Sequence, residues 1–177
     1  RRSKWGYSVE AAGGLLRMIA AQPDLHFAGY SCHVGRFAAD PRAYAVVARA
    51  IGEAVIHLHA ETALWPTMLD IGGGWARQRE PESRAPDLNP FTIEEHAEAA
   101  TAALRAALAP AGRPLPALWL EPGRYIVGNA IVLLARVGAI KRDVGMTWAH
   151  VDASTNDLMR IETSQAWYHL LPASRMD

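Results

Sequence analysis

The sequence has one cysteine, no excess of either charge and no long apolar run. Because Cys32 has no second cysteine to pair with, an internal disulfide framework is excluded, which fits a reducing cytoplasm. The 18 basic and 18 acidic residues cancel, and this argues against a surface for nucleic acid or another polyanion. No apolar run reaches the roughly 18 residues that a membrane span needs. These absences predict a cytoplasmic protein that binds neither nucleic acid nor a membrane.

Helical and strand-like segments alternate through most of the chain. Capping residues and apolar residues spaced three or four apart predict helices at Val9–Ala21, from Pro41 to about His59, and from Thr92 to Ala109. Short apolar runs predict strands at Phe27–Val34, Thr67–Ile71 and Leu118–Leu120. The polar, proline-rich segment Arg77–Pro90 is expected to be a surface loop. This alternation is typical of a parallel sheet built from βα units.

The alternation stops after Val127. Two later segments, Ala130–Lys141 and Thr147–Asp152, predict strands that pair in the antiparallel sense. The chain is therefore expected to change its architecture near residue 129, from an α/β domain over residues 1–129 to a β region over residues 130–177.

Residues suited to binding an anion and to acid–base chemistry follow three of the predicted strands. Asp70 and Ile71 lead into Gly72-Gly73-Gly74, whose backbone amides could approach a phosphate closely because glycine has no Cβ. Glu121 and Arg124 follow the next strand, and His33 with Gly35 follows the first strand. In a parallel α/β barrel, all such strand ends open on one face, where barrel enzymes keep their active sites.

These residues resemble the signature series of a known family. HVG at residues 33–35, DIGGG at 70–74 and EPGRY at 121–125 are similar to motifs of the fold-type III, pyridoxal-phosphate-dependent amino-acid decarboxylases, the group of diaminopimelate, ornithine and arginine decarboxylases. SKWG at 3–6, and VD at 151–152 with NDLMR at 156–160, resemble that family's first and last motifs. A triple glycine alone is a weak signal, but five motifs in the family's order are a strong one.

The resemblance implies a fold, a cofactor and partners. The fold would be α/β, the later half of a pyridoxal-phosphate-binding (β/α)8 barrel leading into the start of a β domain. The implied reaction is decarboxylation of an amino acid such as diaminopimelate, ornithine, lysine or arginine, or of a carrier-bound relative, by an enzyme that is a homodimer when intact. A full barrel of this kind usually needs about 250 residues, so 177 residues are few for it.

The resemblance also implies roles for individual residues. His33 would stack on the cofactor ring, and Glu121 would face its pyridine nitrogen, so both are candidate catalytic residues. The residues expected to bind the cofactor are His33, Gly35, Gly72, Gly73, Gly74, Glu121, Gly123 and Arg124. Those expected to bind the substrate are Arg124 and Arg160. No pair of histidines has convincing zinc-ligand spacing, so no metal is expected.

Each of these residues also has a purely structural interpretation. His33 could be a core histidine bonded to the backbone, Glu121 could pair with Arg124, and Arg160 could be a solvated surface residue. The chain also departs from the family pattern: Arg36 stands where the family usually has serine, Ala153-Ser154 replaces a glycine pair, and Ser164 replaces a tyrosine. The substrate end of the site is therefore not expected to be that of a standard diaminopimelate enzyme.

Lysine is scarce, and the chain contains only Lys4 and Lys141. The resemblance implies that the lysine bound to the cofactor precedes Arg1 and that the catalytic cysteine follows Asp177, since Cys32 does not match it. We therefore expect a segment of a longer enzyme that is inactive alone. Two alternatives remain open: a non-catalytic homologue that binds a partner enzyme, and a racemase-like pyridoxal-phosphate barrel.

Overall fold

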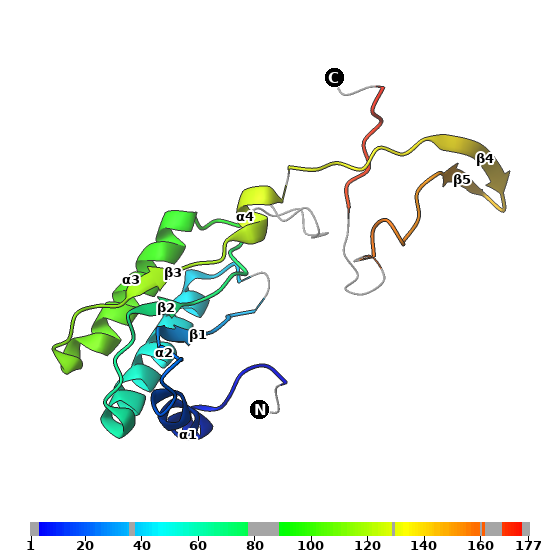
Figure 1. Cartoon of the computed structure of the whole chain (residues 1–177). Helices are drawn as coiled ribbons and strands as arrows, with labels where there is room; N and C mark the ends of the chain where they lie inside the picture. The colour runs from blue at the N-terminus through cyan, green and yellow to red at the C-terminus, as the bar shows by residue number, and fades with distance from the viewer. Residues whose placement is uncertain are drawn as a thin grey trace. The chain divides into compact units, whose positions relative to one another are not determined.

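The computed structural model describes residues 4–35, 38–77, 89–128, 130–159, 161 and 168–174. The chain divides into two compact units, one with the residues up to Gln78 and Asn89–Ile126, and another that includes Val127–Asp177 (Figure 1). Most of the expected surface loop at Arg77–Pro90 lies outside the described residues.

The first unit is built on a parallel three-stranded sheet. Its strands are β1 (Gly29–Ser31), β2 (Met68–Asp70) and β3 (Ala117–Trp119), in the order β1-β2-β3. The helices α2 (Pro41–Thr62) and α3 (Ile93–Leu108) connect consecutive strands, so the unit is a succession of βα units, as the alternation predicted. β1 and β2 are shorter than expected, because the pairing covers only three residues of each, and β3 has the expected length but begins one residue earlier.

Capping residues begin the helices where the sequence predicted them. Ser8 accepts a hydrogen bond from the amide of Ala11 at the start of α1 (Val9–Ala20), and Asp40 accepts one from the amide of Arg42 at the start of α2. Thr92 and Glu95 form a capping box at the start of α3. Helix α2 continues three residues beyond the predicted His59, and ends where Ala63 takes a left-handed conformation with φ 59°.

The core of the first unit lies between the sheet and helices α2 and α3 (Figure 1). Its buried members come from α2, β2, the turn after β2, and α3: Tyr44, Ala48, Ile51, Val55, Leu69, Ile71, Trp75, Ala100, Leu104 and Leu108. Tyr30 and Leu118, which pair with Leu69 in the sheet, pack against this cluster. Because side chains alternate along a strand, Ser31, Asp70 and Trp119 belong to the opposite face of the sheet.

The second unit contains an antiparallel hairpin, as expected. Strand β4 (Val137–Asp143) pairs with β5 (Met146–Val151) across a turn in which Val144 and Gly145 both have positive φ, as in a type I′ turn. The prediction of a strand from Ala130 was wrong in extent, because residues 131–136 lie outside the ladder. Every residue of both strands is exposed. None of the described helices is long and apolar enough to cross a membrane.

Candidate functional site

The three turns that follow β1, β2 and β3 lie against one another. The register pairs Ser31 with Asp70 and Asp70 with Trp119, and hydrogen bonds extend the ladder past these residues. The amide of Cys32 donates to the carbonyl of Asp70 at 2.9 Å, and the amide of Glu121 donates to the carbonyl of Gly72 at 3.1 Å. Two positions further along this register, His33, Gly72 and Glu121 form one row at the carboxyl edge of the sheet.

The glycine turn at residues 72–74 fills the space between the two neighbouring turns. A Cβ on Gly72 would lie 2.7 Å from the carbonyl oxygen of Cys32, and one on Gly73 would lie 2.6 Å from that of Glu121. A Cβ on Gly74 would overlap the carbonyl oxygen of Gly35. Gly72 and Gly74 also have φ of 73° and 86°, which side chains rarely tolerate. The turn therefore requires glycine at all three positions.

The turn begins with a hydrogen bond that sequence reasoning did not anticipate. The amide of Gly72 donates to Oδ1 of Asp70 at 2.8 Å. An aspartate two residues before a glycine of positive φ is the sequence signal of such an Asx turn. Since the Gly72 amide already has this acceptor, the amides that remain for an anion in the turn are those of Gly73 and Gly74, for which the described residues provide no acceptor.

The His33 ring is oriented by its own turn. The amide of Gly35, a residue with φ 114°, donates to Nδ1 of His33 at 2.9 Å. Because Nδ1 is an acceptor, the neutral ring carries its proton on Nε2. That nitrogen faces Gly73, since it would lie 3.4 Å from a Cβ on that residue. His33 is exposed, so the interpretation of it as a core histidine is wrong, although its ring does accept the backbone hydrogen bond which that interpretation expected.

Glu121 and Arg124 lie at the end of β3 and on the short helix α4 (Gly123–Val127). Glu121 is exposed, and its carbonyl accepts a hydrogen bond from the amide of Gly123 at 2.8 Å. Arg124 is half-buried in the first turn of α4. The structure therefore brings His33, Gly72, Gly73 and Glu121 together, with Gly35 against Gly74. Arg124 follows Glu121 by three residues in the chain and lies on α4.

Three buried rings lie beneath the glycine turn. The indole of Trp75 donates from Nε1 to the carbonyl of Gly72 at 2.9 Å, and the hydroxyl of Tyr44 donates to the carbonyl of Gly73 at 3.3 Å. The two rings are stacked, with centroids 4.0 Å apart, and His96 meets Tyr44 edge-on. The sequence analysis missed these supporting residues, because Tyr44 lies on a helix 29 residues before Gly73.

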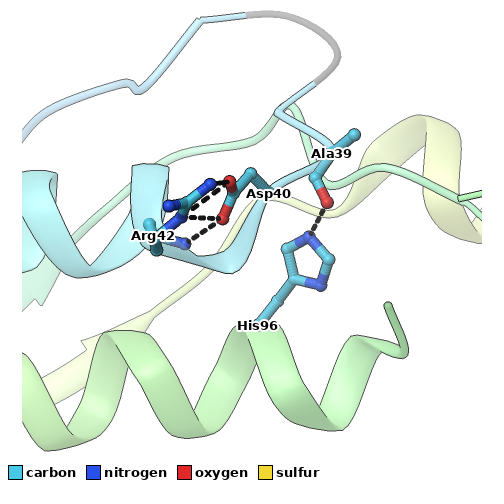
Figure 2. A network of polar contacts seen from close by, with 4 residues as sticks. All are labelled: Ala39, Asp40, Arg42 and His96. Atoms are coloured by element: carbon cyan, nitrogen blue, oxygen red, sulfur yellow. Dashed lines mark hydrogen bonds and ion pairs between the residues drawn. The ribbon is translucent and has the colours of Figure 1, made fainter. Parts of the chain in front are cut away.

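His96 ties this cluster to the start of α2. Its Nε2 lies 3.0 Å from the carbonyl oxygen of Ala39, and its Nδ1 lies 2.7 Å from that of Thr92. Figure 2 shows the His96 ring reaching from α3 to Ala39, beside the carboxylate of Asp40, which accepts hydrogen bonds from Arg42. The chain that follows the His33 turn is thereby anchored to α3.

Burial keeps two acidic groups of β1 and its turn neutral. Burial, with a smaller contribution from the Asp70 carboxylate, raises the pKa of the Cys32 thiol from 9.0 to about 11. Burial raises the pKa of Tyr30 from 10.0 to about 12. A thiol with such a pKa is a poor nucleophile near neutral pH, and Cys32 packs against the core cluster.

Other residues named in the sequence analysis lie outside the described residues or have other partners. Arg36, Arg160 and Ser164 lie outside the described residues. Lys4 lies with its Nζ 4.7 Å from the centroid of the Trp5 ring, and Lys141 pairs with Asp143 at 3.2 Å in the hairpin of the second unit. Among the described residues, no group of three or more histidine, cysteine, aspartate or glutamate side chains could hold a metal ion.

Parallel strands whose carboxyl-end turns lie side by side, here with three glycines, a histidine and a glutamate, define the class of α/β proteins in which ligands commonly bind at this edge of the sheet. Residues 1–128 match the family described as pyridoxal-dependent decarboxylase, pyridoxal binding domain. The chain belongs to this family of pyridoxal-dependent decarboxylases, as its motifs predicted. The expected cofactor, pyridoxal phosphate, is confirmed by this membership.

The relatives found by sequence and by structure include diaminopimelate decarboxylases. The protein of that name from Methanothermobacter thermautotrophicus is 33% identical over 175 residues, which are 98% of this chain and 39% of the relative. The one from Pseudomonas fluorescens is 33% identical over 94% of this chain and 37% of its own. The crystal structure of the M. jannaschii enzyme in co-complex with L-lysine matches with a TM-score of 0.81 and 26% identity, over 96% of this chain and 38% of that one. The chain thus spans less than half the length of these relatives.

Proposed function

We propose that this chain forms the phosphate, ring and pyridine-nitrogen parts of the cofactor site of an amino-acid decarboxylase. The observation that carries the proposal is the row of His33, Gly72 and Glu121 at one sheet edge, with the glycine turn pressed between its neighbours. The missing Cβ atoms let the turn pack against its neighbours, and the Gly73 and Gly74 amides, which have no acceptor among the described residues, are available to an anionic group. The site residues therefore fit pyridoxal phosphate.

The phosphate would be held mainly by backbone amides. Gly73 and Gly74 supply amides that have no acceptor among the described residues. The Gly72 amide is bonded to Asp70, so Gly72 contributes through its left-handed conformation. Gly35, whose carbonyl lies against Gly74, takes a φ of 114° that favours glycine, and Gly123 opens the short helix that carries Arg124. The guanidinium of Arg124 then adds a positive charge with fork geometry, which suits a phosphate.

His33 and Glu121 would act on the cofactor ring. The imidazole, fixed through Nδ1, offers its face as a packing surface for the ring. The carboxylate of Glu121 would hold a proton at the pyridine nitrogen. When bound, the cofactor supplies an electron sink for the electron pair left by departing carbon dioxide. The role of Glu121 is to keep that sink effective through its charge.

We propose a diamino acid related to diaminopimelate as the substrate, on the strength of the names of the relatives. Arg160 and Arg124 would hold the carboxylate that stays on the substrate, since a guanidinium binds a carboxylate through two parallel hydrogen bonds. Arg36, Ala153, Ser154 and Ser164 depart from the family pattern and argue that the substrate contacts differ from those of the relatives.

At the level of architecture, we propose that residues 1–129 are the later part of an α/β barrel and that residues 130–177 begin a β domain, in a cytoplasmic homodimer. The sheet face opposite the core supports this. Trp119 is 58% exposed and Ser31 is exposed on that face, which in a closed barrel would be the interior.

Glu121→Gln in the protein that carries this sequence tests the proposal. We expect turnover of diaminopimelate, measured as carbon dioxide release, to fall roughly 100-fold or more. Affinity for pyridoxal phosphate, measured by absorbance titration, should stay within about twofold, because the phosphate contacts do not involve the carboxylate. Wild-type turnover in the variant would exclude Glu121 as the partner of the pyridine nitrogen. Turnover of lysine, ornithine or arginine alone would instead correct the substrate.

A further inference from the structure

The carbonyl groups of the glycine turn point into the first unit and meet side-chain donors there. The carbonyl of Gly72 accepts from Nε1 of Trp75 at 2.9 Å and from the amide of Glu121 at 3.1 Å. The carbonyl of Gly73 accepts from the hydroxyl of Tyr44 at 3.3 Å. The Gly72 carbonyl therefore has two donors, whereas Tyr44 is the one donor to the Gly73 carbonyl among the described residues.

The orientation of a carbonyl determines the orientation of the next amide. In a trans peptide the C=O and the following N–H point in opposite directions, and no cis peptide occurs in the described chain. Holding the Gly72 carbonyl inward turns the Gly73 amide outward, and holding the Gly73 carbonyl inward turns the Gly74 amide outward. Within the glycine turn, the amides of Gly73 and Gly74 are the two that have no acceptor among the described residues.

The donors themselves have little freedom to move. Tyr44 is 0% exposed and Trp75 is 2% exposed, and their rings stack at an interplanar angle of 13°. His96, also fully buried, packs against the edge of Tyr44 and is bonded to the carbonyls of Ala39 and Thr92. The hydroxyl is thus presented to Gly73 by a packed cluster that connects α2, α3 and the turn.

We propose that Tyr44 is a positioning residue that turns the Gly74 amide outward to receive the cofactor phosphate, while its stacked partner Trp75 orients the Gly73 amide through the Gly72 carbonyl. This inference rests on the proposed function, because it takes the phosphate of pyridoxal phosphate as the anion. It assigns Tyr44 no contact with the cofactor. Its effect is transmitted through one peptide group, so it acts on phosphate binding and leaves ring contacts unchanged.

The test is Tyr44→Phe, which keeps the stacked ring and removes only the hydroxyl. The matched control is Tyr30→Phe, because the Tyr30 hydroxyl is also buried but has no hydrogen-bond partner. Affinity is measured for pyridoxal phosphate and for pyridoxal, which has no phosphate, in each protein. We expect Tyr44→Phe to bind pyridoxal phosphate about fivefold more weakly and pyridoxal equally well, since it leaves a buried carbonyl without its donor. Tyr30→Phe should match the parent with both ligands.

If Tyr44→Phe lost affinity equally for both ligands, or for neither, the inference would be overturned while the proposed function stayed intact. A second measurement separates the two claims. In the unliganded chain, the NMR order parameter of the Gly74 amide should be near that of rigid backbone, about 0.85, and should fall in Tyr44→Phe. If the parent does not bind pyridoxal phosphate, the proposed function fails. In that case, the inference that Tyr44 orients the Gly74 amide still holds if the order parameter falls in Tyr44→Phe. It is overturned if the order parameter does not fall.

Discussion

The two units of the chain differ in what they bury. In the first unit, Tyr44, Val55, Leu69 and Ile71 have no exposed surface, and the sheet and two helices enclose them. In the second unit, both strands of the hairpin are exposed along their whole length. Large apolar side chains there remain in contact with solvent: Ile131 is 89% exposed, Leu134 77% and Trp148 50%.

This contrast shows that local sequence signals are not enough for independent stability. The hairpin has a favourable turn and a regular register, yet an isolated hairpin is marginally stable at best in water. The first unit has short strands of three residues each, but it packs them under two long helices. Stability should therefore depend on the first unit, and the exposed apolar side chains of the second should be available to contact other protein surface.

The largest expected difference between the two units comes from a substitution in the core of the first unit. Leu69→Ala in β2, where the side chain is 0% exposed, should lower the free energy of unfolding by about 2–5 kcal/mol. Leu134→Ala, at a side chain 77% exposed, should change it by less than about 0.5 kcal/mol. Urea denaturation followed by circular dichroism measures both. Similar losses in the two variants would show that the second unit has a core of its own.

A second pair compares two glycines of positive φ. Gly74→Ala should be destabilising by about 2–3 kcal/mol, because the new Cβ overlaps the carbonyl of Gly35 and the residue has φ 86°. Gly145→Ala in the hairpin turn has φ 74° but open space, so only the conformational cost of about 1 kcal/mol applies. Thermal unfolding of the two variants should preserve this order. The reverse order would mean that the turns after β1 and β2 are not packed together.

A third pair compares side chains that accept a hydrogen bond from a backbone amide. Thr92→Ala removes the cap of α3 and one side of its capping box, and should cost about 1 kcal/mol of unfolding free energy. Asp152→Ala removes the acceptor of the Arg136 amide beside the exposed hairpin, where water can replace it, and should cost less than about 0.5 kcal/mol. A larger loss from the Asp152 change in urea denaturation would contradict the assignment of stability to the first unit.

The last expected effect is a pH dependence of the first unit, which leaves stability near neutral pH unchanged and appears only above pH 9. The Cys32 thiol has a pKa near 9.0 when unfolded and about 11 when folded, because burial disfavours the thiolate. Its contribution to stability is therefore complete below pH 9 and is lost as the pH rises toward 11. Cys32→Ala should lose less stability than the parent over this interval. Urea denaturation at pH 9 and pH 11 measures the stability of both proteins. If the parent and Cys32→Ala lost equal stability between these pH values, the thiol would be excluded as the source.

Local features of the sequence predicted much of the fold. The caps at Ser8, Asp40 and Thr92 were correctly located because a capping side chain bonds to amides within three residues of itself. The extents of strands were predicted less well, as at Ala130, because an apolar run shows which residues favour a strand and not where a pairing partner ends.

By itself, the sequence determined the family, the order of the elements and the residues with the chemistry for a cofactor. The roles of all the site residues at the cofactor and substrate remain predictions from the motifs: His33, Gly35, Gly72, Gly73, Gly74, Glu121, Gly123, Arg124 and Arg160. Only the tertiary structure decided that the His33, Gly73 and Glu121 turns meet, and that Tyr44 donates to Gly73 from another element. The physical reason is distance along the chain. A cap or a glycine turn depends on neighbours in sequence, whereas the direction of a carbonyl in that turn depends on a donor delivered by the packing of α2 against the sheet.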